Sequence, residues 1–192
     1  GATVLRVQNL SLPRADQFGV DLIDLQFEVK AGEVVGIAGV SGNGQKELLY
    51  ALSGEDQRAG PASIQVAGQN AGRMGPGQRR ALGLHFVPEE RLGRGAVPTM
   101  GLAHNLLLTR TNAVSGSGWI QVGALQKHAQ SIIERFHVKA GGPNSAAKSL
   151  SGGNLQKFIV GREIDANPTL LIVSQPTWGV DVGAAAQIRG ET

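Results

Sequence analysis

The chain contains no cysteine, which excludes disulfide bonds and cysteine-ligated metal sites. Its four histidines are scattered, without the spacing of a metal site. No apolar run approaches the roughly 20 residues that a membrane-spanning helix needs, so we expect any membrane association to come through a partner. The net charge is +3, without a dense basic patch or interleaved aromatic residues. We therefore expect no nucleic-acid partner.

Glycine, by contrast, is abundant, and the most informative motif is the stretch GVSGNGQK over residues 39–46. A phosphate-binding P-loop has the pattern G-x-x-x-x-G-K-[ST], in which the lysine contacts phosphate and the hydroxyl ligates Mg²⁺. Here Gln45 stands at the lysine position and Lys46 at the hydroxyl position. An amide lacks the positive charge, and an ammonium cannot ligate Mg²⁺. The candidate phosphate contacts are Gly39, Ser41, Gly42, Asn43, Gly44, Gln45 and Lys46.

The flanks of this loop suit a nucleotide site. Residues 32–39 predict a short buried strand that enters the loop, and residues 45–54 predict a helix that leaves it. The backbone N–H groups at such a helix N-terminus could still bind an anion. A glycine-rich turn between strand and helix is equally compatible with a purely structural role, so other motifs must decide.

The stretch KSLSGGNLQKFIVGREI, residues 148–164, resembles the signature motif of the ATP-binding cassette (ABC) family, whose consensus is LSGGQ. Ser151 is a good helix N-cap, and Gly152 and Gly153 allow close backbone approach. Asn154 departs from the consensus glutamine. Exposed N–H groups there suit a γ-phosphate. The alternative is a plain capped helix after a turn, which the P-loop upstream disfavours.

A third motif, TLLIVSQPTWGVD over residues 169–181, is similar to the Walker B strand and D-loop of the same family. By that resemblance, Ser174 replaces the aspartate that organises Mg²⁺, and Gln175 replaces the glutamate that acts as general base. Glutamine cannot accept that proton at neutral pH. Asp181 matches the D-loop aspartate. Because the scaffold residues remain while the chemical ones are replaced, we expect this domain's own site to be hydrolytically silent or nearly so, with no catalytic residue and no metal ligand of its own.

The sequence also differs from the family pattern at two further positions. Glu89, in the stretch VPEER, takes the place of the Q-loop glutamine and is a candidate nucleotide contact. The aromatic residue that stacks on adenine in the family is missing near residues 12–14. Phe18 is close in sequence, but a loop phenylalanine is more often a hydrophobic plug.

The fold class expected from pattern and resemblance is α/β, a P-loop NTPase (ABC ATPase) core with an antiparallel β subdomain and an inserted helical subdomain. Alternating residues predict strands over 4–12, 21–33 and 62–68, and further strands are predicted over 84–87 and 170–173. Helices are predicted over 78–84, 101–109, 122–136 and 155–164. We expect the core to comprise residues 1–94 and 151–192, apparently truncated at its C-terminal end, and the helical subdomain residues 95–150.

Together, GNGQKEL, VPEER, LSGGNLQK and QPTWGVDVGA resemble the second, degenerate domain of tandem ATPases from bacterial importers of simple sugars or nucleosides. The resemblance implies a head-to-tail dimer in which Ser151, Gly152 and Gly153 complete an ATP and Mg²⁺ site of a partner domain. It also implies membrane permease subunits as partners, near residues 89–100, with a substrate-binding protein acting indirectly. The expected location is the cytoplasmic side of the membrane, and the isolated domain is expected to be inactive or very weak.

Two alternatives stay open. One is a soluble ABC protein of translation or DNA repair, which the Pro176–Gly179 stretch and the modest charge disfavour. The other is a scaffold that binds no nucleotide, in which the helix after Ser151 is only a helix.

Overall fold

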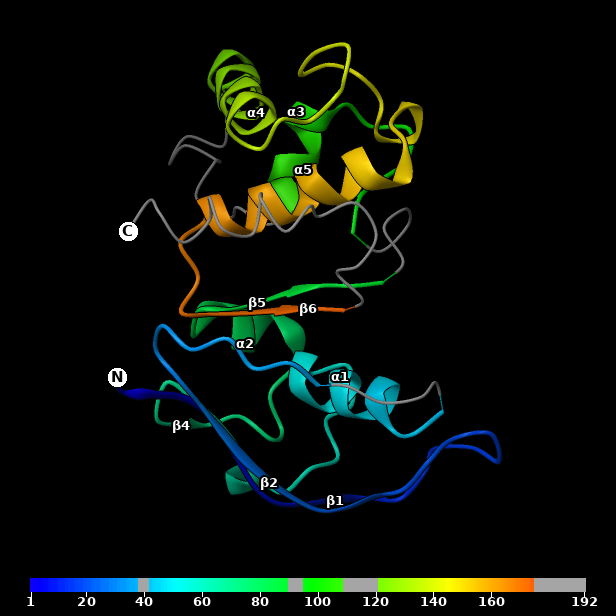
Figure 1. Cartoon of the computed structure of the whole chain (residues 1–192), viewed down its shortest axis with the longest axis vertical. Helices are drawn as coiled ribbons and strands as arrows, with labels where there is room; N and C mark the ends of the chain where they lie inside the picture. Colours follow the sequence, from blue (N-terminus) through cyan, green and yellow to red (C-terminus); the bar gives the residue numbers. More distant parts are fainter. Residues whose placement is uncertain (38–41, 90–94, 109–120, 175–192) are drawn as a thin grey trace. The chain divides into compact units, whose positions relative to one another are not determined.

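The computed structural model describes residues 1–37, 42–89, 95–108 and 121–174. The chain divides into two compact units. The first comprises Gly1–Phe86 and Pro168–Ile172, and the second comprises Val87–Asn167 and the chain from Val173 onward. Figure 1 labels most of the helices and strands.

An antiparallel sheet dominates the first unit (Figure 1). It contains β1 (Thr3–Leu12), β2 (Leu22–Lys30), β3 (Ile64–Val66) and β4 (Gln69–Asn70), in the order β2-β1-β3-β4. Its first three strands were predicted, with wider bounds for β2 and β3. The alternation of apolar and polar residues predicted these strands correctly because one face of the sheet is buried and the other faces solvent.

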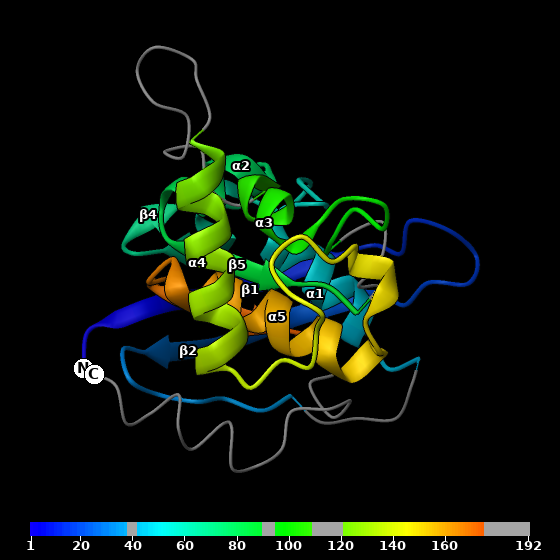
Figure 2. The same ribbon diagram turned by 90° about the horizontal axis from the view of Figure 1, so that it is seen from above.

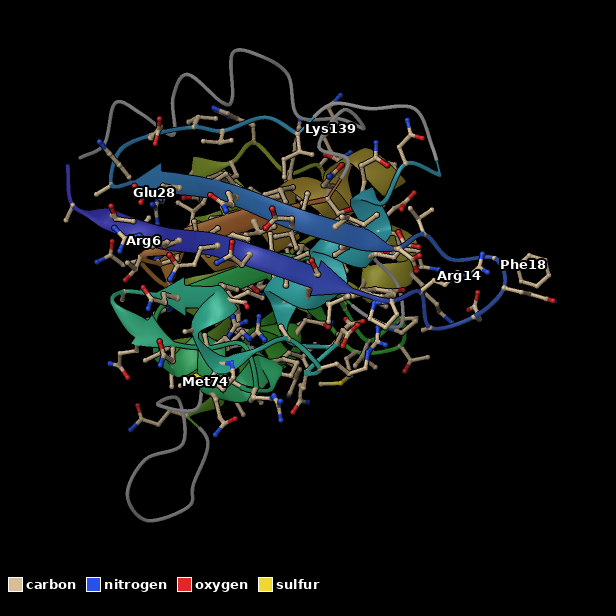
Figure 3. The ribbon with its side chains drawn as sticks, turned by 90° about the horizontal axis from the view of Figure 1, so that it is seen from below. Arg6, Arg14, Phe18, Glu28, Met74 and Lys139 are labelled. Atoms are coloured by element: carbon tan, nitrogen blue, oxygen red, sulfur yellow. The ribbon has the colours of Figure 1, made fainter. Side chains whose placement is uncertain are left out.

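The two faces of this sheet differ in chemistry. Leu10, Ile64 and Val66 are completely buried in the hydrophobic core. On the exposed side, Arg6 and Glu28 are register partners on β1 and β2, and the Arg6 Nε atom lies 2.9 Å from a carboxylate oxygen of Glu28. Figure 3 shows these two side chains next to each other. Such an exposed ion pair contributes little to stability, about 0–1 kcal/mol, so the buried face holds the sheet.

Two helices belong to the first unit. Helix α1 (Gln45–Ser53) ends at Gly54, whose left-handed backbone (φ +90°) closes the last turn. Helix α2 (Pro76–Ala81) starts with proline at its first position, two residues before its predicted start.

Arg79 of α2 is fully buried and caps the end of α1. Its guanidinium donates hydrogen bonds to the carbonyls of Ala51 and Leu52, in the last turn of α1. It also donates to the carbonyls of Met74 and Gly72, at 3.0 and 3.3 Å. Burial lowers the pKa of Arg79 to about 10, so the side chain is still a cation at neutral pH. A positive charge at a helix C-terminus complements the helix dipole.

Strands β5 (Leu84–Val87) and β6 (Leu170–Val173) have the predicted bounds, and they form a separate two-stranded sheet. The hydrogen bonds at its two ends advance in the same direction along both strands, which is the pattern of a parallel pair.

The strand predicted over residues 32–39 is wrong for its described part, residues 32–37, which form no strand. Val34, Val35 and Ile37 are 75%, 45% and 52% exposed. Their apolar character alone suggested a buried strand. A strand also needs a neighbour to hydrogen-bond with, and among the described residues none pairs with this segment.

The second unit is helical (Figure 2). It contains α3 (Leu102–Asn105), the 3₁₀ turns η2 (Leu106–Leu108) and η4 (Ala147–Ser149), α4 (Val122–Arg135) and α5 (Gly152–Asp165). The predictions of α4 and α5 are confirmed. The helix predicted over 101–109 is a single α-turn followed by a 3₁₀ turn, and Thr109 lies outside the described residues.

Helices α4 and α5 pack closely. A Cβ atom added at Gly161 of α5 would lie 2.6 Å from a ring carbon of Phe136 and 3.0 Å from Ile132. At the edge of this contact, Asp165 of α5 interacts with two side chains of α4, His128 and Arg135, the latter at 2.7 Å. Thus a glycine permits the approach, and an acidic residue joins the two helices.

Candidate functional site

The described part of the glycine-rich loop has the backbone of a phosphate-binding turn. Gly42 and Gly44 have φ angles of +91° and +94°, which strongly favour glycine. Gly44 is also the N-cap of α1 and brings no side chain to cap the helix. The first N–H groups of α1 therefore belong to a helix end of the kind that binds anions. Gly39 and Ser41 lie outside the described residues.

The charged side chains that follow the loop do not replace the positive charge that the P-loop lysine would bring to a phosphate. The ammonium of Lys46 lies 5.5 Å from the ring centroid of Tyr50, one turn further along α1. It is thus directed along the helix and away from its N-terminus. Glu47, in the first turn, accepts a hydrogen bond from the backbone N–H of Val20 at 3.2 Å. Its carboxylate places a negative charge beside the anion site, which opposes phosphate binding.

Two predicted site residues, Ser174 and Glu89, follow β6 and β5 at the same end of the β5–β6 sheet. The backbone N–H of Ser174, just after β6, donates to the carbonyl of Val87 at the end of β5, at 3.0 Å. Glu89 follows two residues later and is exposed, whereas Ser174 is buried. Ligands of parallel α/β sheets bind at this carboxyl end. Gln175 and Asp181 lie outside the described residues.

This donor set fits a magnesium ion poorly. Mg²⁺ prefers carboxylate oxygens and phosphates in near-octahedral geometry. By the motif resemblance, Ser174 is predicted to stand at the position of the metal-organising aspartate, and Lys46 at the hydroxyl position of the loop. Within the described ranges, no group of three or more His, Cys, Asp or Glu residues could hold a metal. We therefore assign no metal-dependent step to this chain's own loop.

The signature residues form a complete helix start. Ser151 is the N-cap of α5, and its hydroxyl oxygen accepts the backbone N–H of Asn154 at 3.3 Å. Ser151 and Gly152 are exposed, so this helix end is open to solvent. Its 14 residues are anchored by buried Leu155, Phe158 and Ile159. The spacing of these three apolar residues was visible in the sequence.

A buried asparagine, missed by the sequence reasoning, organises the segment before α3. The side-chain oxygen of Asn105 accepts the N–H of Val97 at 2.7 Å, and its amide nitrogen donates to the carbonyls of Met100 and Gly101, both at 3.0 Å. Its own carbonyl accepts a hydrogen bond from Arg162 of α5 at 3.2 Å. The available signal was a lone amide inside the apolar stretch GLAHNLLL.

Phe18 lies at the tip of the loop between β1 and β2, where it is 87% exposed. Its backbone N–H donates to the side chain of Asp16 at 2.8 Å, which forms a local turn. Figure 3 shows the ring pointing away from the rest of the chain. Its interpretation as a hydrophobic plug is therefore wrong for this structure.

In the described part of the chain, none of the helices combines the length and the apolar character required to cross a bilayer.

The family comparison covers most of the chain. The model of the ABC transporter family matches residues 22–178. Three curated relatives are ATP-binding proteins of importers. The chain is 39% identical over 187 residues to the guanosine import ATP-binding protein NupO of Bacillus subtilis (strain 168), covering 96% of the chain and 36% of NupO.

Two other relatives have similar sequence identity and coverage. The nucleoside import ATP-binding protein NupA of Lactococcus lactis subsp. cremoris (strain MG1363) is 38% identical, covering 97% of the chain and 37% of NupA. The ribose import ATP-binding protein RbsA of Halalkalibacterium halodurans is 35% identical, covering 98% of the chain and 36% of RbsA. The chain thus spans a little over a third of the length of these relatives.

Solved structures of ABC cassettes share the fold. A dimeric post-hydrolysis state of the cassette MJ0796 bound to ADP and Pi has a TM-score of 0.73 at 20% identity, covering 97% of this chain and 80% of that chain. A nucleotide-free cassette from an ABC transporter has a TM-score of 0.72 at 21% identity, covering 98% and 75%. The fold is that of a P-loop NTPase. Because the family model, the importer relatives and the fold agree over most of its length, the chain belongs to the ABC transporter family, as an ATP-binding domain.

Proposed function

We propose that this chain is the degenerate nucleotide-binding domain of an ABC importer ATPase for simple sugars or nucleosides. Its own phosphate loop is silent, and its signature helix completes the active site of a partner domain. The contrast between the two helix starts carries the proposal. Helix α5 presents an exposed, side-chain-capped start at Ser151, whereas α1 begins beside Glu47 and directs Lys46 toward Tyr50.

In the proposed shared site, the partner domain holds ATP and Mg²⁺, which supply the phosphoryl-transfer chemistry. Ser151, Gly152 and Gly153 of this chain bind the terminal phosphate through the hydroxyl and the first N–H groups of α5. Their part is to orient the phosphate and stabilise negative charge, on which phosphoryl transfer mainly depends. Gly39, Ser41–Lys46, Glu89 and Asp181 line this chain's own weak nucleotide site.

The proposed partners follow from the same assignment. The first nucleotide-binding domain of the same protein supplies the competent Walker residues, and membrane permease subunits couple closure to transport at the cytoplasmic face. Residues 89–100 are the proposed permease contact. The hydrogen bonds of Asn105 to Val97 and Met100 fix the described end of that segment to α3. The division into a core and a helical subdomain at residues 95–150 stays a prediction.

ATP hydrolysis by the full-length importer ATPase tests the proposal. Ser151→Arg places a bulky side chain at the start of α5, so we expect turnover to fall by about a hundredfold or more. Gln175→Ala, in the silent site, is the matched comparison and should leave turnover within about twofold. Unchanged turnover in Ser151→Arg would support a scaffold role instead and would contradict the shared site.

A further inference from the structure

Asn154 makes more hydrogen bonds than a helix cap requires. Its side-chain oxygen accepts the backbone N–H of Lys139, in the loop after α4, at 2.8 Å. Its side-chain nitrogen donates to the hydroxyl oxygen of Ser151 at 2.9 Å, and its backbone N–H donates to the same oxygen at 3.3 Å. One residue thus joins the loop after α4 to the N-cap of the signature helix.

The chemistry of these groups fixes the direction of each bond. A backbone N–H can only donate, so the amide of Asn154 must turn its oxygen toward Lys139 and its nitrogen toward Ser151. The Ser151 oxygen then accepts two hydrogen bonds, which occupy both of its lone pairs. Only the hydroxyl proton of Ser151 remains, and it can only be donated. Because Ser151 is exposed, that proton is available to an anion in front of the helix.

A purely structural cap does not need this arrangement. The bond from the backbone N–H of Asn154 to Ser151 already caps the helix. In a capping box, the residue at this third helical position would bond back to the N–H of the N-cap, for which a longer glutamate or glutamine is used. Asn154 instead bonds to the Ser151 hydroxyl and to a separate loop.

We propose that Asn154 is a positioning residue that turns the Ser151 hydroxyl into an obligate hydrogen-bond donor toward the bound terminal phosphate. This inference rests on the proposed function of the signature helix. It assigns a role to the signature position at which this chain departs from the family consensus.

The variant Asn154→Asp tests the direction of the hydrogen bonds. One oxygen of the introduced carboxylate can still accept the Lys139 N–H, but the other now faces the Ser151 oxygen as an acceptor. The Ser151 hydroxyl must then donate to this carboxylate, and it is lost to the phosphate. An aspartate in the first turn of a helix is favourable, so α5 is expected to stay folded.

In the full-length ATPase, we expect Asn154→Asp to lower kcat for ATP hydrolysis by about tenfold or more, with a smaller change in KM. The thermal unfolding midpoint should not fall. The matched control is Asn144→Asp, the same substitution at an exposed position in the same unit, whose side-chain oxygen accepts from Gln126 and can still do so. It should leave kcat unchanged.

Added negative charge beside the phosphate could slow hydrolysis without any change in Ser151. A double-mutant cycle with Ser151→Ala separates the two effects. If Asn154 acts through the serine hydroxyl, Ser151→Ala combined with Asn154→Asp is no slower than Ser151→Ala alone. Additive losses would mean that charge alone is responsible and would overturn the inference.

The experiment distinguishes a failure of the positioning role of Asn154 from a failure of the proposed function. If Ser151→Ala impairs hydrolysis but Asn154→Asp behaves like Asn144→Asp, the positioning role is overturned and the shared site stands. If Ser151→Ala and Ser151→Arg both leave hydrolysis unchanged, the proposed function fails, and the inference fails with it.

Discussion

At the residue scale, one buried cation is an important link between secondary-structure elements. Arg79 donates to four carbonyls, two of them at the end of α1, the helix that follows the phosphate loop. A carbonyl left buried without a donor costs about 1–3 kcal/mol. Arg79 thus links α2 to the last turn of α1.

We therefore expect Arg79→Met to lower the free energy of unfolding by about 3 kcal/mol or more. Urea titration followed by circular dichroism measures it. Arg73→Met is the matched control, because Arg73 is exposed and donates to one carbonyl, that of Ala59, at 2.9 Å. Its cost should be about 1 kcal/mol. Equal losses in the two variants would show that the carbonyl contacts of Arg79 matter little.

The sequence indicated some candidate site residues and gave no sign of the contacts that other residues make. Ser151, Gly152 and Gly153 were predicted from a local motif, and helix capping is a local property that spacing reveals. The contacts of Asn154 with Lys139, and of Asn105 with Arg162, join residues distant in the chain. No local pattern specifies such pairs. Lys46 was predicted as a candidate phosphate contact, but its ammonium lies 5.5 Å from the centroid of the Tyr50 ring, a contact that the motif did not indicate.

At the element scale, α4 and α5 were predictable because each has an apolar stripe of helical period. The prediction of a strand over residues 32–39 was wrong in its described part because apolar character alone does not determine a strand. The residues of this segment are apolar, but a strand forms only where a neighbouring strand pairs with it. The sequence of the segment alone does not show whether such a neighbour exists. Helices make their hydrogen bonds internally, and strands do not.

The close contact of α4 and α5 yields a prediction for Gly161. Alanine there would gain up to about 1 kcal/mol of helix propensity. Its Cβ, however, would lie 2.6 Å from Phe136 and 3.0 Å from Ile132, and overpacking costs about 1–3 kcal/mol. We expect Gly161→Ala to lower the thermal unfolding midpoint.

Gly123→Ala is the matched control, since Gly123 lies in α4 with no atom within 4 Å of an added Cβ. It should raise the midpoint by a few degrees. A stabilising Gly161→Ala would mean that the two helices separate at little cost.

At the scale of the whole molecule, the proposed function describes an ABC domain that keeps its fold while its own site loses its chemistry. Helix α1, the sheets and the capped helix α5 are in place, whereas the resemblance to the family motifs predicts that positions 45, 46, 174 and 175 differ from the consensus. The asymmetry makes sense in a protein in which each ATP site is shared between two domains. One complete site can then work through the signature of a degenerate partner.

The central claim, a silent phosphate loop, can be measured directly by calorimetric titration of ATP with Mg²⁺ into this chain, together with a phosphate-release assay. A variant with Gln45→Lys and Lys46→Thr restores the P-loop pattern and is the matched comparison. We expect weak or undetectable binding and no phosphate release from the unaltered chain, and about tenfold tighter binding in the restored variant. Clear phosphate release by the unaltered chain, or equal affinity in the two proteins, would contradict the account.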